Sequence, residues 1–440
     1  MTVQFFAHGV GGAKDLPIPA EYAIAGACAA LAISFTVLAL AWRAPRFNIG
    51  EQPKPAPPLL ATIVDSTWFK LVARLWGFSF FLYVAVAGVF GKDLAINPIF
   101  GVFFVLLWVG IVPMSLAFGP FYKAISPVRS INWALAKVSG SDPDVGLFRF
   151  PDRLGYWPAA LGLFAFVWFE LVYPFNSELG PLRLWCAIYV GVMLIGGALF
   201  GNRFYERADP FEVFSTLVGH LSVWGRHEGR LVMRSPLANL DLMPVRPGLL
   251  AVGSVLLGST AFDSFKGSNR WTIWSQTTDL NGNLVNLGGL VGFILVVGVL
   301  FAAATMLTGI HAGFRRTELP GEFAHSLIPI VVGYVVAHYL TYLVEYGQQT
   351  VILLSDPLSN GSNVLGTGDR AINYWLSYHP TFLAVTKVLG VIVGHVVAVV
   401  AAHDRAVRLL PKRHQLTGQL SMLVVMVGFT IGGLALLFSS

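Results

Sequence analysis

The sequence predicts an all-α fold: a polytopic integral membrane bundle of about ten transmembrane helices, forming a single domain over residues 1–440. Its composition is the first reason, because 55% of the residues are hydrophobic and only 12% are charged, which is outside the range of soluble globular proteins. Apolar stretches of about 20 residues, enough for one helical crossing of a bilayer, also recur along the whole chain. Nothing between them resembles a soluble catalytic domain. Any chemistry is therefore expected in or beside the membrane.

Ten apolar stretches meet the length requirement for a membrane-spanning helix. They cover residues 20–43, 72–91, 99–119, 155–174, 182–202, 246–263, 286–310, 323–346, 380–402 and 417–438. Several contain small residues four apart, such as "GVIVG" (390–394) and "GFTIGG" (428–433). Such spacing lets two helices approach closely in lipid, so these glycines predict close helix packing.

The basic residues predict the orientation of the chain in the membrane. Of the 29 lysines and arginines, 22 lie in alternate loops, at 43–74, 120–154, 203–246, 311–322 and 403–416. Cytoplasmic loops carry such an excess, so both termini are expected outside the cytoplasm of a multi-pass plasma membrane protein. The net charge of +6 is then explained by the basic residues of the cytoplasmic loops, and no nucleic-acid partner is predicted.

Three loops and two cysteines complete the outline. The Pro-rich "GEQPKPAPPLL" (50–60) predicts a stiff linker, and "LSDPLSNGSNVLGTGDR" (354–370) is typical of a turn-rich loop. The apolar spacing of "DPFEVFSTLVGHLSVWGR" (209–226) predicts a short helix lying along the inner membrane face. Cys28 and Cys186 lie in apolar spans, where they are interpreted as ordinary buried thiols, with a disulfide as the alternative.

The span "FAHSLIPIVVGYVVAHYLTYLVEY" (323–346) is unusual because it carries two histidines and a glutamate. At about 100° per residue, four polar side chains share a stripe roughly 80° wide: Tyr334, His338, Tyr342 and Glu345. Ionisable groups in a bilayer usually face the protein interior or a water-filled cavity. The outer half of this helix is therefore predicted to form one wall of a polar site.

The predicted orientation puts further polar groups at the same outer level. The candidate catalytic residues are Glu170, Asp263, Glu345 and Lys387, and the candidate metal ligands are His338, His379, His8 and Glu345. Carboxylate oxygens and imidazole nitrogens can hold a divalent copper, zinc or iron ion. A metal so held would activate a water for attack on an ester, with a carboxylate or histidine as base. The same groups could instead pass protons or simply join helices.

The remaining histidines fall into two classes. His395 lies deep in the span 380–402 and is the candidate cofactor ligand, because a deep histidine can bind haem. A bis-histidine haem with His338 is disfavoured, since the predicted depths differ by about 10 Å. Four histidines at inner span ends, with basic neighbours, are interpreted as structural: His311, His325, His403 and His414.

Several stretches resemble a family of actinobacterial multi-pass membrane proteins labelled fenitrothion hydrolase. They are "AHGVGGAKDLPIPAEY" (7–22), "DPFEVFSTLVGHL" (209–221), "LGSTAFD" (257–263), "FAHSLIPIVVGYVVAHY" (323–339) and "GHVVAVVAAHDRA" (394–406). The resemblance implies hydrolysis of an organophosphate triester at the membrane, but it brings no catalytic residues with it. Relatives present "AHG" directly after a signal peptide, which implies a histidine able to chelate copper through its amine. Here His8 follows seven residues, which departs from that pattern.

Three functions follow from these observations. The first is a metal-dependent hydrolase of an apolar ester, with its site near the extracytoplasmic surface and its substrate drawn from the lipid bilayer. The second is a membrane transporter or a metal- or electron-handling component, and the third is a structural or assembly subunit beside other membrane subunits. The resemblance favours the hydrolase, whereas the residues alone favour the second function.

Overall fold

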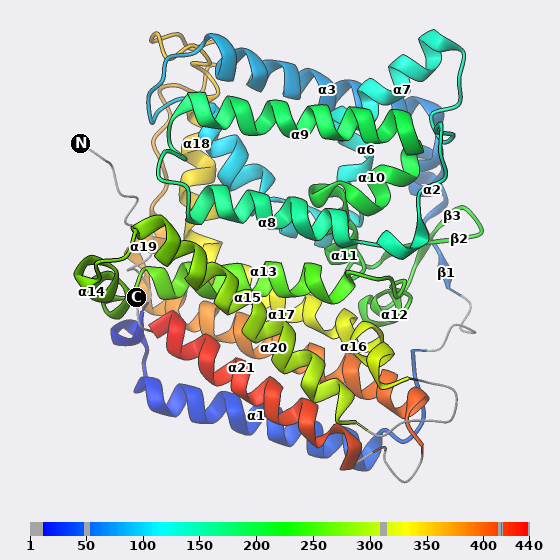
Figure 1. Ribbon diagram of the computed structural model, residues 1–440, viewed down its shortest axis with the longest axis vertical. Helices are drawn as coiled ribbons and strands as arrows, with labels where there is room; N and C mark the ends of the chain where they lie inside the picture. The colour runs from blue at the N-terminus through cyan, green and yellow to red at the C-terminus, as the bar shows by residue number, and fades with distance from the viewer. Residues whose placement is uncertain (1–11, 48–52, 309–314, 412–414, 416, 439–440) are drawn as a thin grey trace. The chain divides into compact units, whose positions relative to one another are not determined.

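The computed structural model describes residues 12–47, 53–308, 315–411, 415 and 417–438 (Figure 1). By length and composition, seven of the described helices can cross a membrane, or eight if the bent pair Pro98–Leu107 and Ile111–Phe118 is one span. A polytopic all-α membrane protein is thus confirmed. The number of ten spans and the side of the termini stay predictions, because α8 (Trp157–Leu171) and α13 (Leu249–Lys266) are not among the seven.

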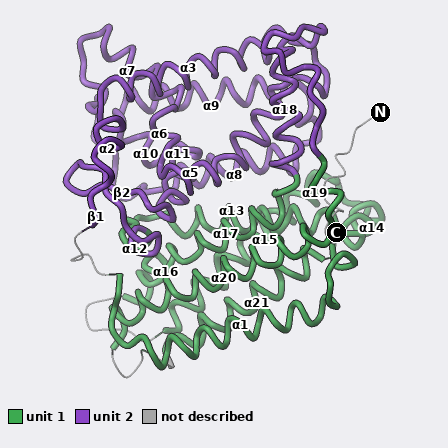
Figure 2. The backbone as a smooth tube through the Cα atoms, turned by 180° about the vertical axis from the view of Figure 1, so that it is seen from behind, with its two compact units in different colours: residues 1–51, 240–341, 374–440 green, residues 52–239, 342–373 purple. Residues whose placement is uncertain are grey.

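The chain forms two compact units, coloured separately in Figure 2. Unit 1 consists of residues 1–51, 240–341 and 374–440, and unit 2 of residues 52–239 and 342–373. The boundaries between the units fall at four points of the chain: 51/52, 239/240 within α12 (Pro236–Asp241), 341/342 within the helical run that follows Leu327, and 373/374. Two compact units can belong to one membrane domain, so the predicted single domain stays a prediction.

Unit 1 is built from long apolar helices. Its elements are η1 (Ala13–Asp15), α1 (Ala20–Ala41), α13, α14 (Asn269–Thr277), α15 (Gly282–Met306), η4 (Arg316–Glu318), α16 (Leu319–Phe323), η5 (Ala324–Ser326), α17 (Leu327–Thr341), α19 (Trp375–Tyr378), α20 (Pro380–Leu409), η8 (Thr417–Gln419) and α21 (Leu420–Phe438). Helix α20 packs against α1, α17 and α21, while α13 packs against α15 and α17. The helix carrying the predicted stripe is therefore central to unit 1.

The end of α20 is tied to the end of α1 by two buried side chains. The Asp404 carboxylate accepts hydrogen bonds from the Trp42 indole (2.9 Å) and the Arg46 backbone N–H (2.7 Å). His403 bonds through one ring nitrogen with the Trp42 carbonyl (3.0 Å) and through the other with the Gln419 amide oxygen (3.1 Å). These bonds agree with the structural role predicted for His403. His311 and His414 lie outside the described residues.

Glycines allow α17 and α20 to approach closely, as the sequence predicts. A Cβ atom added at Gly333 would lie 2.4 Å from the Gly390 carbonyl oxygen, and one at Gly394 would lie 2.6 Å from the Pro329 carbonyl oxygen. Both distances are shorter than van der Waals contact, so the two backbones touch. In lipid this packing, together with interhelical hydrogen bonds, holds helices together.

Replacing Gly333 by alanine is expected to destabilise the protein by about 1–3 kcal/mol, because the new methyl group must push α20 away. Gly292→Ala on α15 is the matched control, since a Cβ there meets nothing within 4 Å. Denaturation of both variants in mild detergent measures the difference. Equal stability of the two variants would contradict the close packing.

Unit 2 contains more short elements than unit 1. They are β1 (Lys54–Pro55), α2 (Pro58–Asp65), α3 (Thr67–Phe90), α4 (Pro98–Gly101), η2 (Val102–Leu107), α5 (Ile111–Phe118), α6 (Tyr122–Ile125), α7 (Pro127–Ser139), η3 (Asp152–Leu154), α8, α9 (Leu179–Phe200), α10 (Asn202–Ala208), α11 (Pro210–Gly219), β2 (Trp224–His227), β3 (Arg230–Met233), η6 (Tyr342–Tyr346) and α18 (Gly347–Leu353). The three strands form one antiparallel sheet in the order β1-β3-β2. Part of the predicted linker at 50–60 is thus a strand paired with Val232 and Met233.

Helix α11 corrects a prediction. It does not lie along a membrane face: nine of its ten residues are buried, and it packs against α5, α6, α8 and α10. The four consecutive residues Phe211, Glu212, Val213 and Phe214 point around the whole helix and all are buried, so no face of the helix lies in water. Its one charged residue, Glu212, has a buried partner, which is described below.

The chain of unit 2 bends within an apolar stretch. The helices Pro98–Leu107 and Ile111–Phe118 meet at 47°, and the first of them ends in η2, which is a π-helix. A second π-helix, η6, packs against η2. π-helical turns are rare and occur often at functional sites.

Candidate functional site

Four side chains from two helices of unit 1 form a hydrogen-bonded cluster. His338 on α17 bonds through Nε2 with the Asp263 carboxylate on α13 (2.8 Å). Its other ring nitrogen, Nδ1, bonds with the Ser264 hydroxyl (3.0 Å). The Tyr339 hydroxyl donates to the same oxygen of Asp263 (2.8 Å). The imidazole of His338 therefore lies between a carboxylate and a hydroxyl.

Adjacent positions on each helix produce this arrangement. Asp263 and Ser264 occupy the last turn of α13, and His338 and Tyr339 occupy the last turn of α17. Neighbouring residues on a helix differ by about 100°, so each pair spreads across the face where α13 and α17 pack. The His338 side chain is 7% exposed and that of Asp263 is 15% exposed, so the cluster is largely shielded from solvent.

The donor and acceptor roles of the two ring nitrogens depend on the tautomer of His338. In the tautomer protonated at Nε2, this nitrogen donates a hydrogen bond to the Asp263 carboxylate, and Nδ1 accepts one from the Ser264 hydroxyl. This is the order of groups used to activate a serine, in which a base accepts the hydroxyl proton and a carboxylate orients the base.

The predicted stripe on residues 334–345 is divided by the structure. Tyr334 and His338 lie in α17 of unit 1, whereas Tyr342 and Glu345 lie in η6 of unit 2, where Glu345 is buried. Glu170, at the end of α8, also belongs to unit 2. Of the acids predicted for the site, Asp263 is the one that bonds with His338.

Three predicted site residues lie apart from one another, at the N-cap of α20 and along that helix. His379 is the N-cap, directly before the first residue of α20, and it is exposed. Its Nδ1 bonds with the Trp375 carbonyl (2.8 Å), and its ring stacks on the Trp375 ring. Lys387 is buried two turns further on. His395 is buried deeper, with Nδ1 donating to the Val391 carbonyl (2.8 Å). Its haem ligation stays a prediction.

The predicted metal set is not assembled among the described residues. His8 lies outside them, and in the part of the chain that the structure describes no three His, Cys, Asp or Glu side chains form a group that could hold a metal ion. Both ring nitrogens of His338 already have partners. A metal ion at His338 would therefore take the place of Ser264 or Asp263 on one ring nitrogen, and the metal site stays a prediction.

A second buried polar cluster, in unit 2, was missed in the sequence. The Arg129 guanidinium on α7 donates to both carboxylate oxygens of Glu212, through Nη2 at 2.7 Å and through Nε at 2.5 Å. Burial opposes the charge on Arg129, but the hydrogen bond and charge of Glu212 outweigh it and raise the pKa of Arg129. Asp209, which precedes α11, is also fully buried. The dipeptide Asp209–Pro210 was the available signal, because an N-cap acid followed by proline is typical of a helix start.

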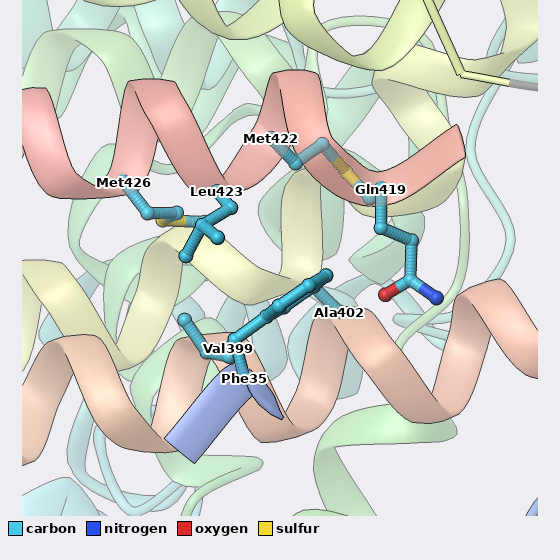
Figure 3. Close-up of a pocket in the computed structure, with 7 residues that line it drawn as sticks. All are labelled: Phe35, Val399, Ala402, Gln419, Met422, Leu423 and Met426. Carbon is cyan, nitrogen blue, oxygen red and sulfur yellow. The ribbon is translucent and has the colours of Figure 1, made fainter. Parts of the chain in front are cut away.

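Two further features lie away from both clusters. Cys28 and Cys186 are free thiols, so the alternative disulfide is not formed, but each is only partly buried. An apolar pocket in unit 1 is lined by α1, α20, η8 and α21 (Figure 3). Gln419 is the one polar side chain among its lining residues, and none of the predicted site residues lines it. The pocket therefore offers no acid or base.

The chain was compared with protein-family models, curated proteins and solved structures, and none of them matches.

Proposed function

We propose that the protein is a membrane-embedded hydrolase of apolar esters, phosphate triesters included, with Ser264 as nucleophile, His338 as general base and Asp263 as the carboxylate that orients His338. The proposal is carried by one observation, the imidazole of His338 bonded to Ser264 on one side and Asp263 on the other. Side chains acting in these roles recur on unrelated folds and are recognised by geometry, not by sequence position.

The reaction proceeds in two steps. His338 takes the Ser264 hydroxyl proton through Nδ1 while the serine oxygen attacks the ester carbon or phosphorus, and the same proton then passes to the departing alcohol. In the second step His338 takes a proton from water, the hydroxide attacks the serine ester, and Ser264 regains its proton. Asp263 stabilises the imidazolium formed in each step, and Tyr339 holds Asp263 in place as a positioning residue.

The family resemblance and the predicted orientation support the same proposal. Asp263 ends the stretch "LGSTAFD", and His338 and Tyr339 end the stretch "FAHSLIPIVVGYVVAHY", both of which resemble the fenitrothion hydrolase family. The positive-inside rule puts this end of α13 and α17 near the extracytoplasmic surface. An apolar ester dissolved in the outer leaflet would then reach the site without crossing the bilayer.

The test is covalent labelling of Ser264 by an alkyl fluorophosphonate, a reagent that phosphylates activated serines. The full chain, purified in mild detergent, is treated with the reagent, digested and analysed by mass spectrometry. We expect the adduct on Ser264 of the wild type, none in Ser264→Ala, and a strongly reduced yield in His338→Ala.

Ser259→Ala is the matched control, because Ser259 is equally buried on α13 and its hydroxyl donates to the Leu256 carbonyl of the same helix. It should label like the wild type. A wild type that hydrolyses an apolar ester without forming the Ser264 adduct would overturn the assignment of the nucleophile. Absence of both the adduct and any ester hydrolysis would overturn the proposed function.

Proton-linked transport is the second candidate, and the bend at 47° between Pro98–Leu107 and Ile111–Phe118 favours it. Interrupted helices line substrate and ion sites in many transporters. In that case the same Ser264, His338 and Asp263 chain would carry protons. Proton uptake into liposomes containing the purified protein, without ester hydrolysis, would select this candidate.

A further inference from the structure

Asp209 in unit 2 is a buried acid that the proposed hydrolase does not use. It is 0% exposed and caps the N-terminus of α11. Its Oδ1 atom accepts three hydrogen bonds, from the Tyr189 hydroxyl (3.0 Å), the Phe211 N–H (3.0 Å) and the Glu212 N–H (3.3 Å). One oxygen of the carboxyl group is therefore fully occupied.

The other oxygen of Asp209 has no such partner. Among the described residues, neither Oδ2 of Asp209 nor the hydroxyl of Tyr205 forms a hydrogen bond, although both atoms are buried. Tyr205 and Asp209 are four residues apart, and the Asp209 N–H donates to the Tyr205 carbonyl (3.2 Å). A buried polar atom without a partner is costly, so an ionised carboxylate is disfavoured at this position.

The cations near Asp209 are engaged elsewhere. Arg129 on α7 is bound by Glu212 and the Asn202 carbonyl, and Arg207 on α10 donates to Asp152 (2.7 Å). Among the described residues no lysine or arginine donates a hydrogen bond to Asp209, although its charge helps to raise the pKa of Arg129. Its nearest charged neighbour on α11 is Glu212, which carries the same sign and holds Arg129. An ionised Asp209 would therefore be a buried anion without a cation of its own, which is costly.

We propose that Asp209 is a proton-binding site of unit 2, whose Oδ2 atom carries an exchangeable proton. The ligand of the site is thus a proton. This assignment is independent of the chemistry proposed at His338.

The electrostatics of Asp209 agree with this assignment. Burial, followed by the negative charge of Glu212, raises the pKa of Asp209 from 3.8 to about 7, and the hydrogen bonds to Oδ1 offset only part of this. At a pH between these two pKa values, Asp209 is protonated in the folded protein but ionised in the unfolded chain. Unfolding in this window releases a proton, so the contribution of Asp209 to stability falls as the pH rises from about 4 to about 7.

Infrared difference spectroscopy of the full chain in detergent tests the site, because a protonated carboxyl group and a carboxylate absorb at different frequencies. Spectra are recorded from a pH of about 5 to about 9, with and without ¹³C-labelled aspartate. We expect an aspartic carboxyl band that disappears around neutral pH and shifts on labelling. This measurement needs no variant, so it remains decisive if a substitution prevents folding.

Two variants assign the band. Asp209→Asn keeps a good helix cap and should lose the band, whereas Asp152→Asn, at an exposed acid paired with Arg207, should keep it. A labelled wild type without the band, or a folded Asp209→Asn that keeps it, would overturn the proton site.

Discussion

Removal of the His338 imidazole is expected to lower kcat/KM for an apolar ester by about 10³- to 10⁴-fold, which corresponds to about 4–5.5 kcal/mol of transition-state stabilisation. Without the imidazole, Ser264 loses the base that accepts its proton, and Asp263 loses the cation that it stabilises. Steady-state hydrolysis of a chromogenic ester by the detergent-purified His338→Ala and His338→Gln variants measures the effect. Glutamine can still form hydrogen bonds but cannot accept the serine proton as a base. A low rate in a folded His338→Gln variant is therefore due to the lost base and not to lost folding.

His220→Gln is the matched control for this experiment. His220 follows α11 in unit 2 and bonds through Nδ1 with the Thr216 carbonyl (2.8 Å), so its loss should leave the rate near that of the wild type. Wild-type rates in folded His338→Ala would contradict the role of His338 as the base. Tyr339→Phe should have a smaller effect than His338→Ala, because it removes one of the hydrogen bonds to Asp263.

Replacing Arg129 by methionine is expected to destabilise the protein by about 3–5 kcal/mol, because the buried Glu212 carboxylate then loses its counter-ion. Glu212 is 1% exposed and Arg129 is 7% exposed, so water cannot replace the lost partner. Denaturation in mild detergent, followed by circular dichroism, measures the loss of stability.

The double variant Arg129→Met with Glu212→Leu should recover most of that stability, since no buried charge is left unpaired. Lys123→Met is the matched control, because it breaks the ion pair with Glu206, in which both side chains are about half exposed. Such surface pairs contribute roughly 0–1 kcal/mol. If Arg129→Met were no less stable than Lys123→Met, the buried pair would not hold unit 2 together.

The spans were predictable because the bilayer imposes a length and an apolar composition that can be counted along the chain. Helix α1, for example, covers Ala20–Ala41 against a predicted span of 20–43. Helix α11 was not predictable in the same way. At ten residues it is too short to span, and only the tertiary structure shows that its surroundings are protein instead of water.

The candidate site was predicted in part. His338 and Asp263 were singled out because ionisable groups are costly in a membrane and each lies near the outer end of a predicted span. Ser264 and Tyr339 were missed because a serine and a tyrosine carry no comparable cost, and only the packing of α13 on α17 gives them partners. The stripe was extended to Glu345 on the assumption of a regular α-helix. The π-helix η6, whose turn holds one more residue, breaks that regularity after Thr341.

The order in which unit 1 assembles follows from how its segments are distributed along the chain. Helix α1 packs against α20 and α21, and some 340 residues lie between Ala41 and Pro380. At a synthesis rate of about 5–20 residues per second, α20 is synthesised roughly 20 seconds to a minute after α1. During that time residues 52–239 of unit 2 are already complete. The packing surface of α1 therefore stays without these partners until α20 and α21 have been synthesised.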